Sequence, residues 1–188
     1  TTAKQTFTSA NTTLTISNSS TLSNALNNMI NINGQSNGTV IIEAGSLAET
    51  TGTKSNTING ASASNLTITN SGTIISASSK AINLTDVESG SLTNNSGGII
   101  KAKTNTISML ENTGTTDDIT INNYGTIFAT DDDDAGTNTI KSDDDSSNIT
   151  INNFKGGHIY QTSLAPVIVV GGSTTLTNSG KIENKDGP

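Results

Sequence analysis

The chain has 188 residues, of which 30% are hydrophobic and 3% aromatic, and its formal net charge is −7. Asn, Thr and Ser together fill 82 positions, while Cys and Arg do not occur. This composition excludes disulfides, thiolate metal sites and a basic surface for nucleic acid or anionic lipid. Because the apolar residues are mostly Ile, Leu and Val set among Thr, it predicts a β-protein with a thin core. No stretch approaches the roughly 18 apolar residues of a membrane span, so we expect no membrane insertion of this chain.

The first 37 residues predict a strand followed by a cap. Residues 13–17 alternate polar and apolar side chains, as a strand does. In residues 20–30 the apolar side chains fall at helical spacing, and Ser20 stands where an N-cap would. These apolar residues are Leu22, Ala25, Leu26, Met29 and Ile30. We therefore expect a short capping helix here, because the first coil of a stacked repeat exposes apolar core and unpaired strand edges.

From residue 38 onward the sequence repeats itself. The pattern Gly-x-Ile/Leu recurs at intervals of 27, 25, 28, 32 and 23 residues, at Gly45, Gly72, Gly97, Gly125, Gly157 and Gly180. A second apolar landmark follows at Ile58, Ile82, Ile107, Ile140 and Ile168. A third precedes the next glycine, and its members are Leu66 with Ile68, Leu92, Ile119 with Ile121, Ile149 with Ile151, and Leu176. Each unit carries three short strand signals but too little apolar surface to fold alone, which is typical of a solenoid.

The repeat predicts an all-β fold, a right-handed parallel β-helix of about five to six coils. It would form one continuous domain over residues 38–188, and we expect the natural solenoid to continue beyond the last residue. Ile and Leu would point inward, and Thr, Ser and Asn would form outward ladders. Asn and Gly both tolerate positive φ, so we expect stretches such as Asn123 to Gly125 to turn the corners between strands. An antiparallel sandwich also has many short strands, but it gives no reason for the sequence to repeat.

Runs of aspartate are the most distinctive charged feature, and they interrupt the repeat in its turns. The first candidate contact surface consists of Asp131, Asp132, Asp133, Asp134, Asp143, Asp144 and Asp145. Carboxylates stacked at one corner of adjacent coils repel each other unless a cation lies among them, and Ca²⁺ takes six to eight oxygen ligands. The candidate ligands are Asp117, Asp118, Asp143, Asp144 and Asp145. The alternative is a solvated acidic loop without any cofactor.

A second candidate contact surface is a ladder of Thr and Asn from two nearly identical repeats. Its members are Thr120, Thr150, Asn122, Asn123, Asn152 and Asn153. Catalysis is not expected, because nothing in the spacing pairs a nucleophile or a carboxylate with the single histidine, His158. The carboxylates Asp86, Glu88 and Glu111 are scattered along the sequence.

The repeat "ITINNYGTIF", with its variants "LTITNSGTII" and "LTNSGKI", resembles the passenger domain of a Gram-negative autotransporter (type V secretion) adhesin. The resemblance runs from about Gly38 to Glu183. It implies export through the outer membrane and display on the bacterial cell surface. There the passenger would act in attachment, self-association, biofilm formation and virulence. Its partner would be a host surface protein or glycan, or another copy of the chain. The alternative function is a polysaccharide-binding or polysaccharide-degrading β-helix, similar to a tailspike or a lyase.

Overall fold

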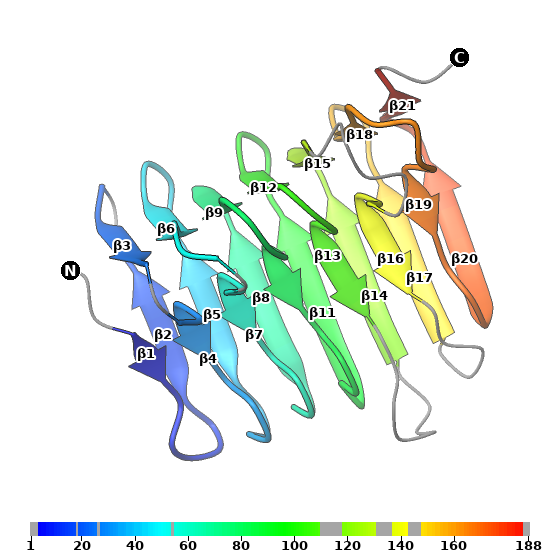
Figure 1. Ribbon diagram of the computed structural model, residues 1–188. Helices are drawn as coiled ribbons and strands as arrows, with labels where there is room; N and C mark the ends of the chain where they lie inside the picture. Colours follow the sequence, from blue (N-terminus) through cyan, green and yellow to red (C-terminus); the bar gives the residue numbers. More distant parts are fainter. Residues whose placement is uncertain are drawn as a thin grey trace.

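The computed structural model describes residues 4–17, 19–25, 27–53, 55–109, 118–130, 137–142 and 148–185. In these ranges all regular structure is β-strand, and β1 and β21 lie at opposite ends of an elongated stack (Figure 1). The strands form three sheets of seven strands each, and neighbouring strands pair in parallel. Helices long and apolar enough to cross a membrane are absent from the described residues.

Each sheet takes every third strand of the chain. Sheet A consists of β1 (Gln5–Thr6), β4 (Ile30–Asn31), β7 (Ile58–Asn59), β10 (Ile82–Asn83), β13 (Ile107–Met109), β16 (Ile140–Ser142) and β19 (Ile168–Val169). Sheet B consists of β2 (Thr13–Ile16), β5 (Thr39–Ile42), β8 (Leu66–Asn70), β11 (Ser89–Asn94), β14 (Asp118–Asn123), β17 (Asn148–Asn153) and β20 (Ser173–Asn178). Sheet C consists of β3 (Thr21–Asn24), β6 (Leu47–Thr50), β9 (Thr73–Ser76), β12 (Ile99–Ala102), β15 (Thr126–Ala129), β18 (His158–Gln161) and β21 (Lys181–Asn184).

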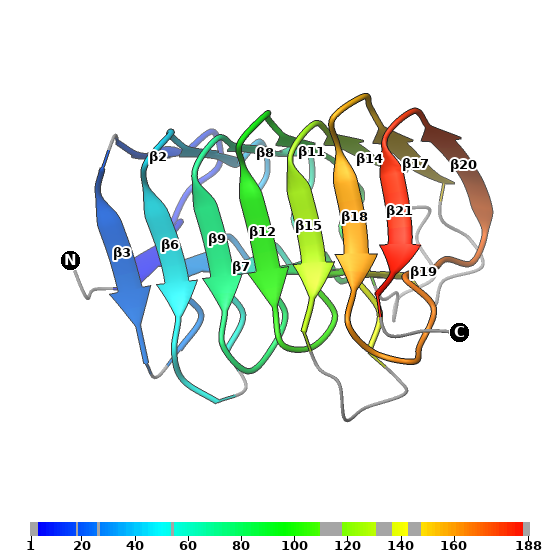
Figure 2. The same ribbon diagram turned by 90° about the horizontal axis from the view of Figure 1, so that it is seen from above.

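One strand from each sheet, taken in chain order, makes one coil, so coil 1 is β1–β3 and coil 7 is β19–β21. Figure 2 shows sheet C face-on, with its strands side by side along the stack. The chain makes about six turns between its first and last coil, and the predicted parallel β-helix is confirmed. The three strand landmarks of the repeat are also confirmed. In coil 3, for example, Ile58 begins β7 and Leu66 begins β8.

The predicted capping helix over residues 20–30 is wrong. The start of this segment forms β3 and its end leads into β4, while Leu26 lies outside the described residues. Leu22 and Met29 are both buried, but they enter the core from different sides of the coil. Their helical spacing is a coincidence of two inward positions, and Asn is a poor helix former. β3 pairs with β6 of coil 2 and β4 pairs with β7 of coil 3, so both strands join the same stack as the later coils.

The pairing of sheet C corrects two of the glycine landmarks. Each strand of this sheet is preceded by an equivalent residue, namely Ser20, Ser46, Gly72, Gly98, Gly125, Gly157 and Gly180. Gly45 and Gly97 stand one residue before the equivalent position. The numbers of the equivalent residues differ by 26, 26, 26, 27, 32 and 23, so the first four intervals are nearly equal. The spacing of the glycines in the sequence is irregular partly because Gly45 and Gly97 do not occupy the equivalent position.

Close packing between coils explains the glycine that precedes a sheet C strand. A Cβ atom on Gly125 would lie 2.3 Å from the carbonyl oxygen of Gly98 in the coil before it. The positive φ that the sequence predicted for these corners is found one residue earlier, at Gly45 (76°) and Gly97 (82°). Glycine is therefore needed at Gly125 for space and at Gly45 and Gly97 for backbone conformation.

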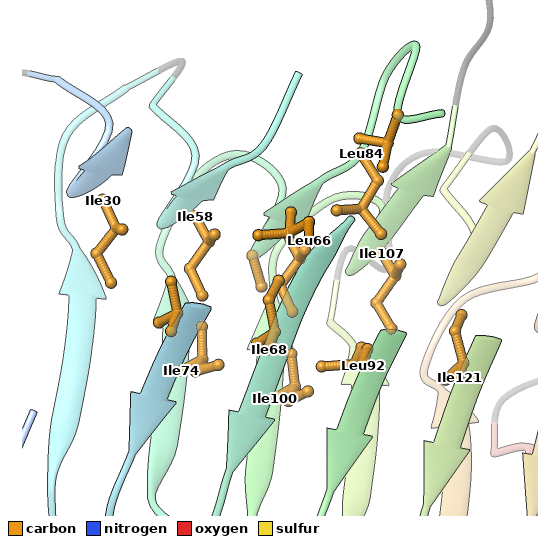
Figure 3. Packing of buried hydrophobic residues seen from close by; sticks show 14 of the residues in the cluster. Ile30, Ile58, Leu66, Ile68, Ile74, Leu84, Leu92, Ile100, Ile107 and Ile121 are labelled. Carbon is orange, nitrogen blue, oxygen red and sulfur yellow. The ribbon is translucent and has the colours of Figure 1, made fainter. Parts of the chain in front are cut away.

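The core is a narrow column of aliphatic side chains enclosed by the three sheets (Figure 3). Ile68, Leu92 and Ile121 occupy the same register position on successive strands of sheet B, and all three are buried. Ile74 and Ile100 enter from sheet C. Burying each such side chain contributes about 1.5–3 kcal/mol, so the stack is stabilised by many similar contributions along its length.

Candidate binding surface on sheets B and C

Most of the predicted acidic site residues lie outside the described residues. These are Asp117, Asp131, Asp132, Asp133, Asp134, Asp143, Asp144 and Asp145. Asp118 is described: it begins β14, is exposed, and its Oδ1 accepts a hydrogen bond of 2.9 Å from Nδ2 of Asn148 in the next coil. No group of three or more His, Cys, Asp or Glu side chains suited to a metal ion occurs within the described ranges. Contact through the acidic loops and binding of Ca²⁺ both stay predictions.

The predicted Thr/Asn ladder divides between the outside and the inside of the coil. Asn122 and Asn152 point outward, and Nδ2 of Asn152 donates to Oδ1 of Asn122 at 3.0 Å. Asn123 and Asn153 point inward and are only 0% and 1% exposed. Adjacent residues of a strand lie on opposite faces of the sheet, so only one asparagine of each pair can reach a partner. The prediction of a contact surface is therefore wrong for Asn123 and Asn153.

These two inward residues belong to a buried asparagine ladder that follows one register position of sheet B. The ladder consists of Asn70, Asn94, Asn123 and Asn153, which are buried, and Asn178, which is exposed on the last coil. Nδ2 of each of the first four donates to Oδ1 of the next at 2.8–2.9 Å. Nδ2 of Asn94 also reaches the carbonyl oxygens of Gly98 (3.2 Å) and Thr126 (3.3 Å). The ladder thus joins each coil to the next through bonds between side-chain amides, and it joins sheet B to sheet C through bonds to backbone carbonyl oxygens. Both kinds of hydrogen bond are strengthened by the low local dielectric.

Two rows of outward residues on sheet B form a polar surface, which we call the threonine face. Its first row is Thr13, Thr39, Thr67, Ser91, Thr120, Thr150 and Thr175, and its second row is Thr15, Ile41, Thr69, Thr93, Asn122, Asn152 and Thr177. None of these residues is charged, and both rows run through all seven coils. Parallel strands lie about 4.8 Å apart, so the first row presents a hydroxyl group at that repeat. The second row presents hydroxyl or amide groups in every coil except coil 2, where Ile41 stands. Sheet C differs, because charged residues such as Glu49, Lys101 and Glu183 occupy its outward positions.

Four of the five aromatic residues gather on coils 5 and 6, which sequence reasoning missed. Tyr124 stacks on Phe154 at the corner between sheets B and C, with ring centroids 4.3 Å apart and planes 3° apart. Phe128 stacks on Tyr160 on sheet C, with centroids 4.7 Å apart. A signal was present in the sequence: "ITINNYGTIF" and "ITINNFKGGHIY" place an aromatic residue five positions after their first isoleucine. Equal offsets in neighbouring repeats predict side chains that stack across parallel strands.

The aromatic pair on sheet C is covered by cations on both sides. Lys101 Nζ lies 5.6 Å from the centroid of the Phe128 ring, and Lys185 Nζ lies 3.5 Å from that of Tyr160. Such cation–π contacts contribute about 0.5–1 kcal/mol at exposed sites. We therefore infer that the stacked rings of Phe128 and Tyr160, each with a lysine beside it, stiffen sheet C.

A small ionic cluster adjoins this column on coils 6 and 7. Oε1 of Glu183 lies 2.8 Å from Nε2 of His158, and its Oε2 lies 2.6 Å from Nζ of Lys181. The hydrogen bond from Lys181 is the largest cause that lowers the pKa of the Glu183 carboxyl; desolvation opposes it, and the weaker hydrogen bond from His158 adds to the lowering. His158 thus occupies an outward strand position beside a carboxylate. The cluster is a surface ion pair and contributes little to stability.

A shallow polar hollow of about 290 Å³ opens on the outer side of sheet B, where β8, β11 and β14 begin. Its lining consists of Asn65, Leu66, Thr67, Ser89, Gly90, Ser91 and Asp118. Oγ of Ser89 donates to Oδ1 of Asn65 at 2.8 Å. Among these lining residues, Asp118 carries the charge. The hollow overlaps the threonine face at Thr67 and Ser91, and Tyr124 directly follows the end of β14.

No family model, no curated protein and no solved structure matches this chain.

Proposed function

We propose that this chain is a non-catalytic adhesive scaffold, the passenger fragment of an autotransporter displayed on the bacterial cell surface. It attaches to a host surface protein or glycan, or it associates with further copies of itself. The resemblance of the repeat supplies the class of protein. The threonine face supports the adhesive role, because its first row offers an uncharged hydroxyl group in every coil and its second row is interrupted only at Ile41.

Many weak polar contacts on one rigid surface suit this role. A single hydroxyl–partner bond has a net value of about 0.5–1.5 kcal/mol, which gives negligible affinity alone. Contacts that are fixed on one body act together, because after the first contact the others form within the same complex. The parallel sheet holds its rows in register over seven coils, so an extended partner can be contacted at many points at once.

An adhesion assay with protein-coated beads tests the proposal. Beads carrying the chain should clump together or attach to host cells. The double variant Thr120→Lys and Thr150→Lys, which places two charges on the threonine face, should reduce either effect at least severalfold. Thr120→Lys alone and Thr126→Lys are the matched pair, because each adds one lysine to coil 5, the first on sheet B and the second on sheet C. Beads that neither clump nor attach would refute the proposal, and equal losses in both variants would refute the assignment to the threonine face.

The acidic loops and the alternative function are tested in the same system. Deleting residues 131–134 should weaken attachment if this loop contributes contacts, and unchanged attachment would remove it from the surface. A Ca²⁺ titration with an EDTA control, followed by thermal denaturation, tests the proposed cation site. Release of sugar from bacterial or host polysaccharide would favour the polysaccharide-degrading alternative, since an adhesin releases none.

A further inference from the structure

One face of the Tyr124 ring is covered by an aromatic ring, and the other, which we call the open face, is turned toward the smaller polar side chains of coil 4. Phe154 covers the ring on the side of coil 6, and Tyr124 is nevertheless 39% exposed. On the side of coil 4 the equivalent position is Asn95, whose Nδ2 donates to Oγ of Ser71 in coil 3 at 2.8 Å. Among the described residues no other ring and no lysine stacks on this face of Tyr124. The Tyr124 ring is larger than the side chains of Asn95 and Ser71 in the two preceding coils. We therefore infer a step in the surface between coils 4 and 5, where part of the ring face projects beyond Asn95.

The polar hollow lies on the same strand as this step, six residues earlier. It combines a carboxylate from Asp118, an amide from Asn65 and hydroxyls from three residues, Thr67, Ser89 and Ser91. Carboxylates accept only, whereas amides and hydroxyls both donate and accept, so the set can satisfy groups that do both. Six residues of extended strand from Asp118 to Tyr124 cover about 20 Å. The outward residues of β14 between Asp118 and Tyr124 are Thr120 and Asn122, which belong to the threonine face and are uncharged.

We propose that a neutral oligosaccharide binds along β11 and β14, from the polar hollow to the open face of Tyr124. This names the partner class of the adhesive surface proposed above and rests on that proposal. A pyranose ring has an apolar face of C–H groups that packs on an aromatic ring, and its hydroxyls both donate and accept hydrogen bonds. Carboxylate, amide and hydroxyl groups beside an open aromatic face are the chemistry that recognises such a molecule.

The charges of the surface decide between classes of ligand. An acidic glycan or a nucleic acid would bring negative charge to Asp118 without a cation at the described positions of the hollow. The chain as a whole is also negatively charged, at −7. The lysine-flanked aromatic column of sheet C is no alternative platform, since Lys101 and Lys185 occupy its outer ring faces. A neutral polyol is the class that meets no opposing charge.

Binding of the purified chain to immobilised neutral and acidic oligosaccharides tests the inference. We expect retention on neutral oligosaccharides and about tenfold weaker binding by Tyr124→Ala, which corresponds to about 1.4 kcal/mol for the lost ring face. Tyr124→Phe keeps the ring and should bind almost as the unchanged chain does. Phe128→Ala, which removes a ring from sheet C in the same coil, should bind normally, and thermal denaturation verifies that each variant is folded. Absence of retention on every neutral oligosaccharide would overturn the inference, as would equal losses in Tyr124→Ala and Phe128→Ala.

Periodate treatment of the target cells separates this inference from the proposed function. Periodate cleaves vicinal diols and so destroys the glycans. Bead attachment that disappears after treatment supports the inference. Attachment that survives treatment, but is still lost in the Thr120→Lys and Thr150→Lys variant, overturns the glycan as partner and leaves the adhesive function standing. Beads that neither attach to cells nor clump overturn the adhesive function, while the oligosaccharide binding measurement still decides on the sugar.

Discussion

Replacing Asn123 by alanine should destabilise the fold far more than its polarity suggests. Oδ1 of Asn123 accepts from Asn94 Nδ2 at 2.9 Å, and its Nδ2 donates to Asn153 Oδ1 at 2.8 Å. Each lost bond costs about 1 kcal/mol, and an acceptor left buried without a donor costs a further 1–3 kcal/mol. Asn153 is 1% exposed, so water cannot replace the missing donor. We expect Asn123→Ala to lower the free energy of unfolding by about 3–5 kcal/mol.

The adjacent residue provides a matched control. Asn122 points outward and is half-buried, and its side chain accepts one hydrogen bond, from Asn152. Water can replace that bond, so Asn122→Ala should lower the free energy of unfolding by about 0.5 kcal/mol or less. Urea denaturation followed by far-UV circular dichroism measures both, with midpoints compared at a common slope. Equal losses in the two variants, or a loss below about 1 kcal/mol for Asn123→Ala, would refute the buried ladder.

Three further outcomes follow from the packing and the charges. Ile121→Ala should lower the free energy of unfolding by about 2–5 kcal/mol in the same denaturation experiment, because Ile121 is fully buried in the core column. Gly125→Ala should prevent the native coil spacing and yield little folded protein in an expression and circular dichroism test, since its Cβ would lie 2.3 Å from the Gly98 carbonyl oxygen. A stable Gly125→Ala protein would contradict the close approach of these coils. The pKa of Glu183, measured by NMR titration, should lie below its ordinary value and rise in Lys181→Met, because the bond from Lys181 is the largest cause of the shift. Since that pKa is lower in the folded chain than in the unfolded one, the ion pair stabilises the folded state at pH values above the unfolded-state pKa. This contribution disappears as the pH falls through the folded-state pKa. A Glu183 pKa unaffected by Lys181→Met would contradict the ion pair.

The sequence alone determined the architecture, because the signals that specify it are local and recur. Alternation around Ile119 and Ile121 indicates a strand with one buried face, and its recurrence indicates that the strands stack. The same local reasoning failed at residues 20–30. There, apolar residues of two short strands happened to fall at helical spacing, and only pairing with the next coil made the strands more stable than a helix.

The tertiary structure decided which side chains share a surface. Whether Asn122 or Asn123 faces the core depends on the register between coils, and a shift of one residue would exchange the two faces of the strand. The pairing of Tyr124 with Phe154 likewise joins residues that lie 30 positions apart in the chain. Such contacts are fixed by the parallel pairing of β14 with β17, through hydrogen bonds between segments that the local sequence does not relate. The repeat therefore defined the stack, and the register between coils defined the threonine face, the buried asparagine ladder and the open face of Tyr124.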